Sequence, residues 1–382
     1  MRIFTCSCGN RLYFDNSRCV NCGHDVGWCP SCRQISDVEP RQPAGYQCVS
    51  CHAALVKCGN AVAYGVCNRF VLEPVVKSAM QGQVPKPDPQ APAIPVVLLC
   101  DCCRFNKTIP DLKVQGNAEK WRRLEAAKRR SLYNLWQVGF RFGNERDGVT
   151  PPLAFEFKAE AQTTHVYKDM GTGEKVYTGH ADGRITINIR EADDVEREKL
   201  RVEMHEAQRS LLGHFRHEMG HYIWDEYVKG GGQREAACIE VFGDHDSPTY
   251  ADALQAYYAN GPKANWVGNY VSAYATMHPW EDFAETFAVY LDMTAALETA
   301  YHNGLIAELH LDDLDWMCER YLKLGIALNE MNRSNGLLDY LPEVIAEPVK
   351  GKLAFIHGLT KVDPTAGRVE EKAEQPELAG VQ

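Results

Sequence analysis

The feature that most constrains the fold is the spacing of the cysteines in the first part of the chain. The chain has 382 residues and 15 cysteines, and 13 of these cysteines lie before residue 104. Many of them form pairs separated by one or two residues. This spacing is typical of zinc knuckles, whereas a disulfide framework is typical of small secreted proteins. We therefore expect reduced thiolates that bind metal.

Four cysteine pairs of the knuckle type come first. Two knuckles place four sulfur atoms around one zinc ion, which completes the closed tetrahedron of a structural site. The predicted ligands are Cys6, Cys8, Cys19 and Cys22 for one site, and Cys29, Cys32, Cys48 and Cys51 for the other. Pairing across the two ribbons stays open, because the first pair is CxC instead of CxxC. Such small ribbons bury too little apolar surface to fold without the metal.

A third cysteine group is interrupted by a proline-rich stretch at residues 84–95. Its members are Cys58, Cys67, Cys100 and Cys103, with Cys102 as a competing thiol. The group fits either a third structural zinc site or a set of thiols without metal. The sequence therefore predicts two or three structural zinc ions.

The charge of the chain argues against nucleic acid as a partner. The formal net charge is -10 and the pI is about 5.7, which disfavours general affinity for phosphate backbones and anionic membranes. Residues 1–70 contain seven basic and four acidic residues, or +3, and two four-thiolate zinc sites of about −2 each bring this to about −1. We expect the ribbons to stabilise the protein or to bind a protein partner.

The sequence has neither a charged leader with an apolar segment nor a run of about 18 apolar residues. We therefore expect a cytoplasmic protein that does not enter a membrane.

Residues 214–221 read HFRHEMGH and contain the pattern HExxH. On a helix, residues four apart share one face, so His217 and His221 can bind one zinc ion while Glu218 stands beside it to handle protons. The surrounding residues 193–228 contain no proline and have apolar residues at steps of three and four. This pattern predicts a mostly helical stretch. The alternative is an ordinary buried helix with two hydrogen-bonded histidines.

A catalytic zinc needs a third protein ligand and an open position for water. Trp224 and Tyr227 stand where HExxHxxGxxH needs glycine and histidine, so a three-histidine site of that type is excluded. We prefer Glu281, because Glu285 follows one helical turn later and can accept the outer N–H of a ligand histidine. A carboxylate in a first helical turn is also favoured without any metal. The alternative ligands are Glu240, which follows His221 after eighteen residues, His205 and His278.

Apolar periodicity outlines the other elements. It predicts helices over residues 117–137, 279–300 and 311–331, and a strand over 184–190 in which isoleucines alternate with polar residues. The predicted domains are tandem zinc ribbons at 1–70, a proline-rich insertion with the third cysteine group at 71–112, a catalytic domain at 113–357 and a disordered tail at 358–382.

These motifs resemble those of the gluzincins, HExxH metallopeptidases with a downstream glutamate ligand that include thermolysin and the anthrax lethal factor. The chain is more closely similar to a bacterial family of zinc-binding metallopeptidases with an N-terminal zinc ribbon. The matching stretches are residues 6–51, 186–193, 217–224 and 272–285. The resemblance implies an α+β fold, in which a small β-rich zinc-ribbon module precedes a zincin-like domain that is mostly helical with a small sheet.

The resemblance also implies roles for individual residues. It makes His217, His221 and Glu281 the ligands of one catalytic zinc, Glu218 the general base and Glu285 the partner of a ligand histidine. In enzymes like the lethal factor, a tyrosine seven residues before the ligand glutamate assists the oxyanion. Tyr274 has this position, and its phenol is a suitable donor, although it could also be a packing tyrosine.

The activity that follows is zinc-dependent hydrolysis of peptide bonds in a peptide or protein substrate, with Glu218 as general base. We expect strand 184–190 to lie at the edge of the sheet and to pair with an extended substrate. The alternative is a zinc-stabilised adaptor protein, in which the ribbons recruit a protein and the HExxH domain is inactive.

Overall fold

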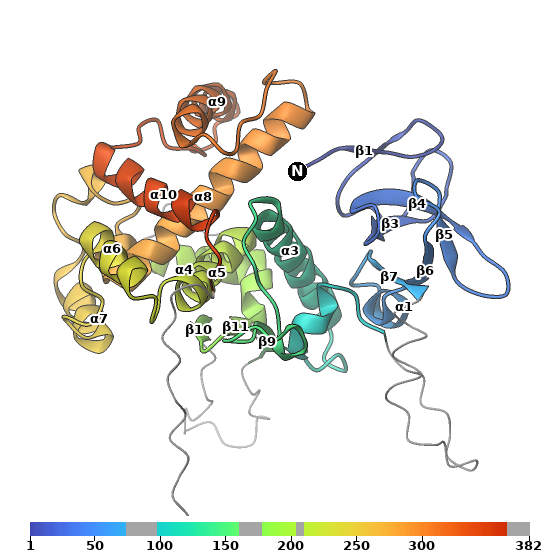
Figure 1. Cartoon of the computed structure of the whole chain (residues 1–382), viewed down its shortest axis with the longest axis horizontal. Coiled ribbons are helices and arrows are strands. Elements are labelled where there is room, and N and C mark those ends of the chain that lie inside the picture. Colours follow the sequence, from blue (N-terminus) through green and yellow to red (C-terminus); the bar gives the residue numbers. More distant parts are fainter. Residues whose placement is uncertain (74–97, 160–177, 204–209, 365–382) are drawn as a thin grey trace, which may run out of the picture.

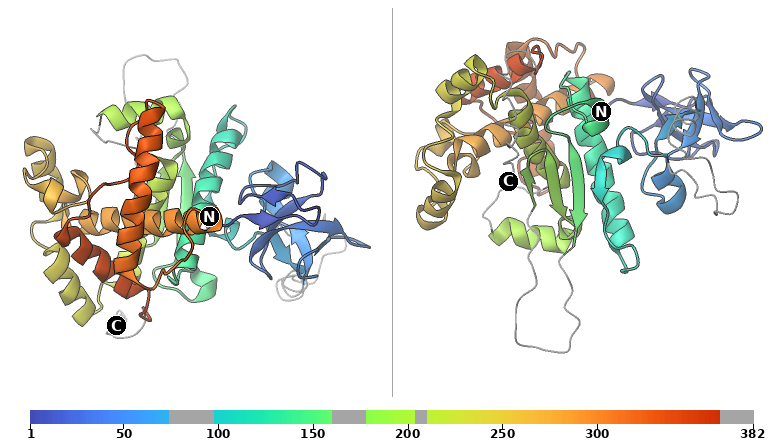
Figure 2. Two further views of the ribbon diagram at one scale, coloured as in Figure 1. Left: turned by 90° about the horizontal axis from the view of Figure 1, so that it is seen from above. Right: turned by 60° about the horizontal axis from the view of Figure 1, so that its bottom comes forward.

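The computed structural model describes residues 1–73, 98–159, 178–203 and 210–364. Within these ranges the chain has the predicted α+β fold, with a β-rich N-terminal module followed by a mostly helical domain (Figure 1). The views in Figure 2 place this module, coloured blue, at one end of the molecule. The proline-rich stretch at 84–95 and residues 365–382 of the predicted tail lie outside the described residues.

The N-terminal module contains a two-stranded sheet, β1-β2, and a five-stranded antiparallel sheet in the order β3-β4-β5-β6-β7. The strands are β1 (Phe4–Thr5), β2 (Arg11–Leu12), β3 (Val26–Cys29), β4 (Gln34–Pro40), β5 (Tyr46–Cys48), β6 (Ala54–Lys57) and β7 (Phe70–Leu72), and helix α1 (Gly59–Tyr64) lies between the last two strands. The sheet therefore continues past the predicted module end at residue 70.

The second domain contains a four-stranded sheet in the order β10-β11-β9-β8. Its strands are β8 (Asn106–Thr108), β9 (Ala154–Lys158), β10 (Gly179–Ala181) and β11 (Arg184–Asn188). Strands β8 and β11 run parallel to β9, whereas β10 is antiparallel to β11. Ile185 and Ile187 are buried, as the alternating pattern predicts.

The expectation that strand 184–190 lies at the sheet edge is wrong. Asp182 and Gly183 both have positive φ, 48° and 76°, and they turn the chain so that β10 pairs with the outer side of β11. Among the described strands, β10 is therefore the edge strand at this end of the sheet. Strand β11 also ends at Asn188, because Ile189 begins a 3₁₀ helix.

Three helices lie at predicted positions with small changes at their ends, and two lie within the predicted helical stretch 193–228, whereas the helices at 250–260 and 347–359 were not predicted. The second domain contains eight described α-helices. They are α3 (Asn117–Gln137), α4 (Asp194–Glu203), α5 (Leu211–Tyr227), α6 (Gln233–Phe242), α7 (Tyr250–Asn260), α8 (Pro279–His302), α9 (Leu314–Ser334) and α10 (Glu347–Leu359). The short 3₁₀ helices are η1 (Cys103–Phe105), η2 (Glu145–Asp147), η3 (Ile189–Ala192), η4 (Trp266–Gly268) and η5 (Tyr274–Thr276). None of the helices described is long and apolar enough to cross a membrane.

Side-chain caps explain where several helices begin. Ser210 accepts a hydrogen bond from the backbone N–H of Gly213 and starts α5. Asp313 accepts one from Trp316 and starts α9 three residues after the predicted position. At the other end of the chain, α10 passes the predicted domain end at 357 and stops at Leu359, which is buried.

The HExxH helix α5 packs closely against α8. Gly220 makes this possible, because a Cβ atom at its position would lie 2.8 Å from the Cα atom of Ala284. On α5, Phe215, Met219 and Ile223 are buried in the main core. The packing brings the histidines of α5 beside the first turn of α8, which contains Glu281.

The N-terminal module packs against α3 through aromatic side chains. The ring of Tyr133 lies 5.2 Å from the ring of Phe14 and 5.9 Å from that of Trp28, measured between centroids. The hydroxyl of Tyr133 donates a 2.6 Å hydrogen bond to Glu298 on α8. Tyr133 thus connects the module, α3 and α8.

Candidate metal centre

Three potential ligand atoms from α5 and α8 converge at one point. Nε2 of His217 lies 3.2 Å from Nε2 of His221, and Oε2 of Glu281 lies 3.1 Å and 3.5 Å from these two atoms. Ligand atoms about 2.0–2.1 Å from a tetrahedral zinc stand about 3.3 Å apart. The three atoms therefore have the separations that three corners of a zinc site require.

Glu285 fixes the orientation of His217. Its Oε1 lies 2.7 Å from Nδ1 of His217, and its Oε2 accepts a 2.7 Å hydrogen bond from the hydroxyl of Ser272. Because an ionised carboxylate only accepts, Nδ1 carries a proton and Nε2 faces Glu281. Burial disfavours the charged imidazole, but Glu281 and Glu285 outweigh it and raise the pKa of His217 well above its usual value. The negative charges of Glu281 and Glu285 therefore favour a cation at His217, either a proton or a metal ion.

Glu218 lies next to His217 and is buried, with 7% of its surface exposed. Burial raises the pKa of its carboxyl. Its Oε2 has no hydrogen-bond partner within the part of the chain that the structure describes. A buried carboxylate with a free oxygen beside a candidate metal position has the properties of a proton acceptor.

Two tyrosines lie beside these groups. The ring of Tyr274, in η5, is 6.2 Å from the ring of His217. Burial, together with the charge of Glu281, raises the pKa of Tyr274, so the phenol keeps its proton at neutral pH. Tyr250, at the start of α7, donates a 2.8 Å hydrogen bond to Oε1 of Glu281. Tyr250 could not be identified from the sequence, because it belongs to another helix and to no local motif.

The alternative ligands do not join this group. Glu240 is exposed on α6 and is not among the converging donors. His278 instead caps α8, where its Nδ1 accepts a 3.2 Å hydrogen bond from the backbone of Trp280. His205 lies outside the described residues.

Aromatic rings surround His221. The ring of Trp280 lies 3.7 Å from it, and the ring of His180, on strand β10, lies 6.2 Å away. Burial lowers the pKa of His180 to about 3, so this imidazole is neutral at physiological pH. Its position shows that the edge strand β10 runs next to the candidate metal centre, which the sequence did not reveal.

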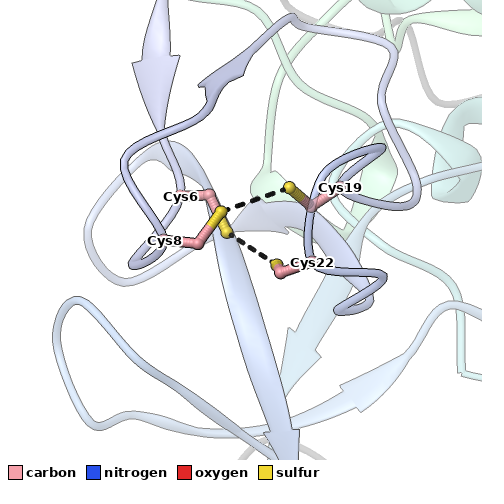
Figure 3. A group of neighbouring side chains, drawn as sticks. All are labelled: Cys6, Cys8, Cys19 and Cys22. Carbon is pink, nitrogen blue, oxygen red and sulfur yellow. Dashed lines mark hydrogen bonds between the residues drawn. The ribbon is translucent and has the colours of Figure 1, made fainter.

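The cysteines of the N-terminal module form the two groups expected from sequence order, and the third group also converges. Figure 3 shows Cys6 and Cys8 facing Cys19 and Cys22. The sulfur–sulfur distances include 3.6 Å for Cys6–Cys22, 3.7 Å for Cys8–Cys19, 3.6 Å for Cys29–Cys51, 3.8 Å for Cys32–Cys48 and 3.7 Å for Cys67–Cys100. A disulfide would be about 2.05 Å long, whereas thiolates about 2.3 Å from a tetrahedral zinc stand about 3.8 Å apart.

Comparison with known proteins agrees with this geometry. A family model described as "Putative zinc-binding metallo-peptidase" matches residues 117–359, and a zinc-ribbon domain model matches residues 3–80. The chain belongs to this zinc-binding metallopeptidase family. The resemblance inferred from the motifs is therefore confirmed at the level of the family and of its N-terminal zinc ribbon.

Similar chains occur in mycobacteria. Uncharacterized proteins of Mycobacterium tuberculosis and Mycobacterium bovis are 35% identical to this chain over 377 residues, which is 96% of each chain. No solved structure matches the chain. The likeness thus extends over both the ribbon module and the metallopeptidase domain.

Proposed function

We propose that the protein is a zinc-dependent peptidase whose zinc is held by His217, His221 and Glu281. The observation that carries this proposal is the mutual separation of the three ligand atoms, 3.1 to 3.5 Å. Membership of a zinc-binding metallopeptidase family supports both the metal and the class of reaction. When bound, zinc supplies a Lewis acid that acidifies water and polarises the substrate carbonyl.

The side chains around the ligands have separate roles in the proposed reaction. Glu218 takes a proton from the attacking water and delivers it to the leaving amine. Glu285 keeps the ring of His217 in place by accepting the hydrogen of Nδ1. Tyr274 donates a hydrogen bond from its phenolic O–H to the oxyanion that develops on the substrate, because its raised pKa keeps the phenol protonated.

An extended peptide is the substrate that suits the sheet. Strand β10, at the edge among the described strands, has backbone groups to offer a pairing strand. Its residue His180 stacks near His221, so a peptide paired with β10 runs past the ligand atoms. In this proposal β10 takes the role that the sequence had given to residues 184–190.

The decisive experiment replaces Glu218 with Gln, which keeps the shape of the side chain but removes the proton acceptor. We expect hydrolysis of a peptide mixture to fall by about 10² to 10⁴-fold, while the zinc content stays at the wild-type value. Glu240→Gln is the matched control, because Glu240 is exposed on α6, and it should retain both activity and zinc.

Two results would contradict the proposal. Hydrolysis at the wild-type rate by zinc-loaded Glu218→Gln would remove Glu218 from the reaction. Failure of the zinc-loaded wild-type protein to hydrolyse any peptide of a diverse library would favour the adaptor function instead.

A further inference from the structure

The third cysteine group has the geometry of a zinc site in the interior of the protein. Its members are Cys58, Cys67, Cys100 and Cys103, and all four are buried. Their sulfur atoms lie within 4.8 Å of one another, and the 3.7 Å between Cys67 and Cys100 matches the separation of two thiolates on one zinc, about 3.8 Å. Cys102 is equally buried but is left out of the group.

Backbone hydrogen bonds around these sulfurs are those of a knuckle. The N–H of Arg104 donates to the carbonyl oxygen of Cys100 at 3.0 Å. The same bond, from the fourth residue after the first cysteine, closes the CxxC turns that begin at Cys19, Cys29 and Cys48. The segment that contains Cys100 and Cys103 therefore folds like the knuckles of the other two cysteine groups.

Two further backbone groups point at the sulfurs. The N–H of Cys100 donates to Sγ of Cys58, and the N–H of Cys103 donates to Sγ of Cys100, each at 3.4 Å. Such donors favour the thiolate, which is the form of cysteine that binds metal. The group is thus arranged to hold negative sulfur atoms in the protein interior, where positive charge must compensate them.

The four cysteines come from two different parts of the molecule. Cys58 directly follows β6, and Cys67 precedes β7, in the five-stranded sheet of the ribbon module. Cys103 begins η1, which leads into β8, an edge strand of the metallopeptidase sheet. The pair Cys100 and Cys103 also lies between the two family models, which match residues 3–80 and 117–359.

A buried polar network continues from the group into the metallopeptidase domain. Sγ of Cys103 lies 4.0 Å from Glu125 on α3, and Glu125 accepts hydrogen bonds from Asn106 on β8 and from Lys128. Glu125 and Lys128 are fully buried. A shift of the cysteine group would therefore disturb α3 and β8 together.

We propose that the third group binds a structural zinc ion that fastens the ribbon module to strand β8 and helix α3. This site is separate from the proposed peptidase centre and does not depend on peptidase activity. It accounts for four converging thiolates, of which one pair, Cys100 and Cys103, lies outside both family models.

Metal counting on the full-length chain tests the proposal without a cysteine substitution. Three cysteine groups and one His–Glu group would give four zinc ions per wild-type chain. His217→Ala should then retain three after dialysis against a weak chelator. Three zinc ions in the wild type and two in His217→Ala would overturn the third site. Equal counts in both proteins would instead contradict the zinc of the proposed peptidase centre.

Substitutions then locate the metal. Cys100→Ser combined with Cys103→Ser should lose one zinc per chain, and amide hydrogens of β8 should exchange faster with solvent. Cys102→Ser is the matched control, since Cys102 is a buried neighbour outside the group, and it should keep the wild-type zinc count. An unchanged zinc count in the double variant, or an equal loss in Cys102→Ser, would refute the assignment. If the double variant does not fold, the counts on wild type and His217→Ala still decide.

Discussion

Two phenols with different contacts lie beside Glu281. Tyr250 donates its hydrogen bond to a carboxylate oxygen of Glu281, so it acts on the ligand itself. Tyr274 lies beside the ring of His217, and burial with the charge of Glu281 raises its pKa. The contacts favour a positioning role for Tyr250 and an oxyanion-binding role for Tyr274.

Phenylalanine substitutions separate these two roles. We expect Tyr274→Phe to lower kcat by about 10² to 10³-fold with little change in KM or in zinc content. Tyr250→Phe removes the partner of a ligand carboxylate, so zinc affinity should fall by about 10- to 100-fold, while kcat recovers at saturating zinc. Steady-state kinetics at several zinc concentrations measure both effects. If kcat at saturating zinc fell in Tyr250→Phe but not in Tyr274→Phe, the two roles would have to be exchanged.

At the scale of elements, the metal centre depends on the contact between α5 and α8. His217 and His221 come from one helix and Glu281 from the other, so the distance between the helices sets the separation of the ligand atoms. Gly220 lies one residue before His221 and faces the backbone of Ala284. A side chain at Gly220 would therefore act on the site without touching any ligand.

Gly220→Ala tests this close approach. The added Cβ would lie 2.8 Å from the Cα atom of Ala284, so the helices must move apart. We expect the free energy of unfolding to fall by about 1–3 kcal/mol and zinc to bind more weakly. Gly351→Ala on α10 is the control, because its Cβ would meet nothing within 4 Å and alanine stabilises helices by up to about 1 kcal/mol. Urea unfolding and zinc titration measure these effects. Equal stability and equal zinc affinity in the two variants would contradict the close approach of α5 and α8 at Gly220.

At the scale of the whole molecule, the ribbon module and the helical domain share a packed interface. Tyr133 belongs to the hydrophobic cluster of the module, although it comes from α3. Its hydroxyl also binds Glu298, which is 1% exposed. The position of the module is therefore coupled to α8, the helix that contains Glu281.

Substitutions at Tyr133 measure this coupling. Tyr133→Ala removes the contacts with Phe14 and Trp28, and we expect it to lower the free energy of unfolding by about 3–5 kcal/mol. Tyr133→Phe keeps the ring and loses only the hydrogen bond to Glu298, which should cost about 1–3 kcal/mol. Equilibrium denaturation of the zinc-loaded proteins gives both values. An unchanged stability of Tyr133→Ala would mean that the module does not pack on α3 in solution.

The sequence alone determined the features that depend on local spacing. In HExxH and in the pair Glu281 and Glu285, residues four apart share a helical face, and each CxxC pair forms its turn within a few residues. The tertiary structure alone decided which distant parts meet. In the folded chain Glu281, rather than Glu240, lies beside the histidines. Tyr250 contacts Glu281, and β10 pairs with the edge of β11. Such contacts depend on how helices and strands pack, and packing joins residues that no local period relates.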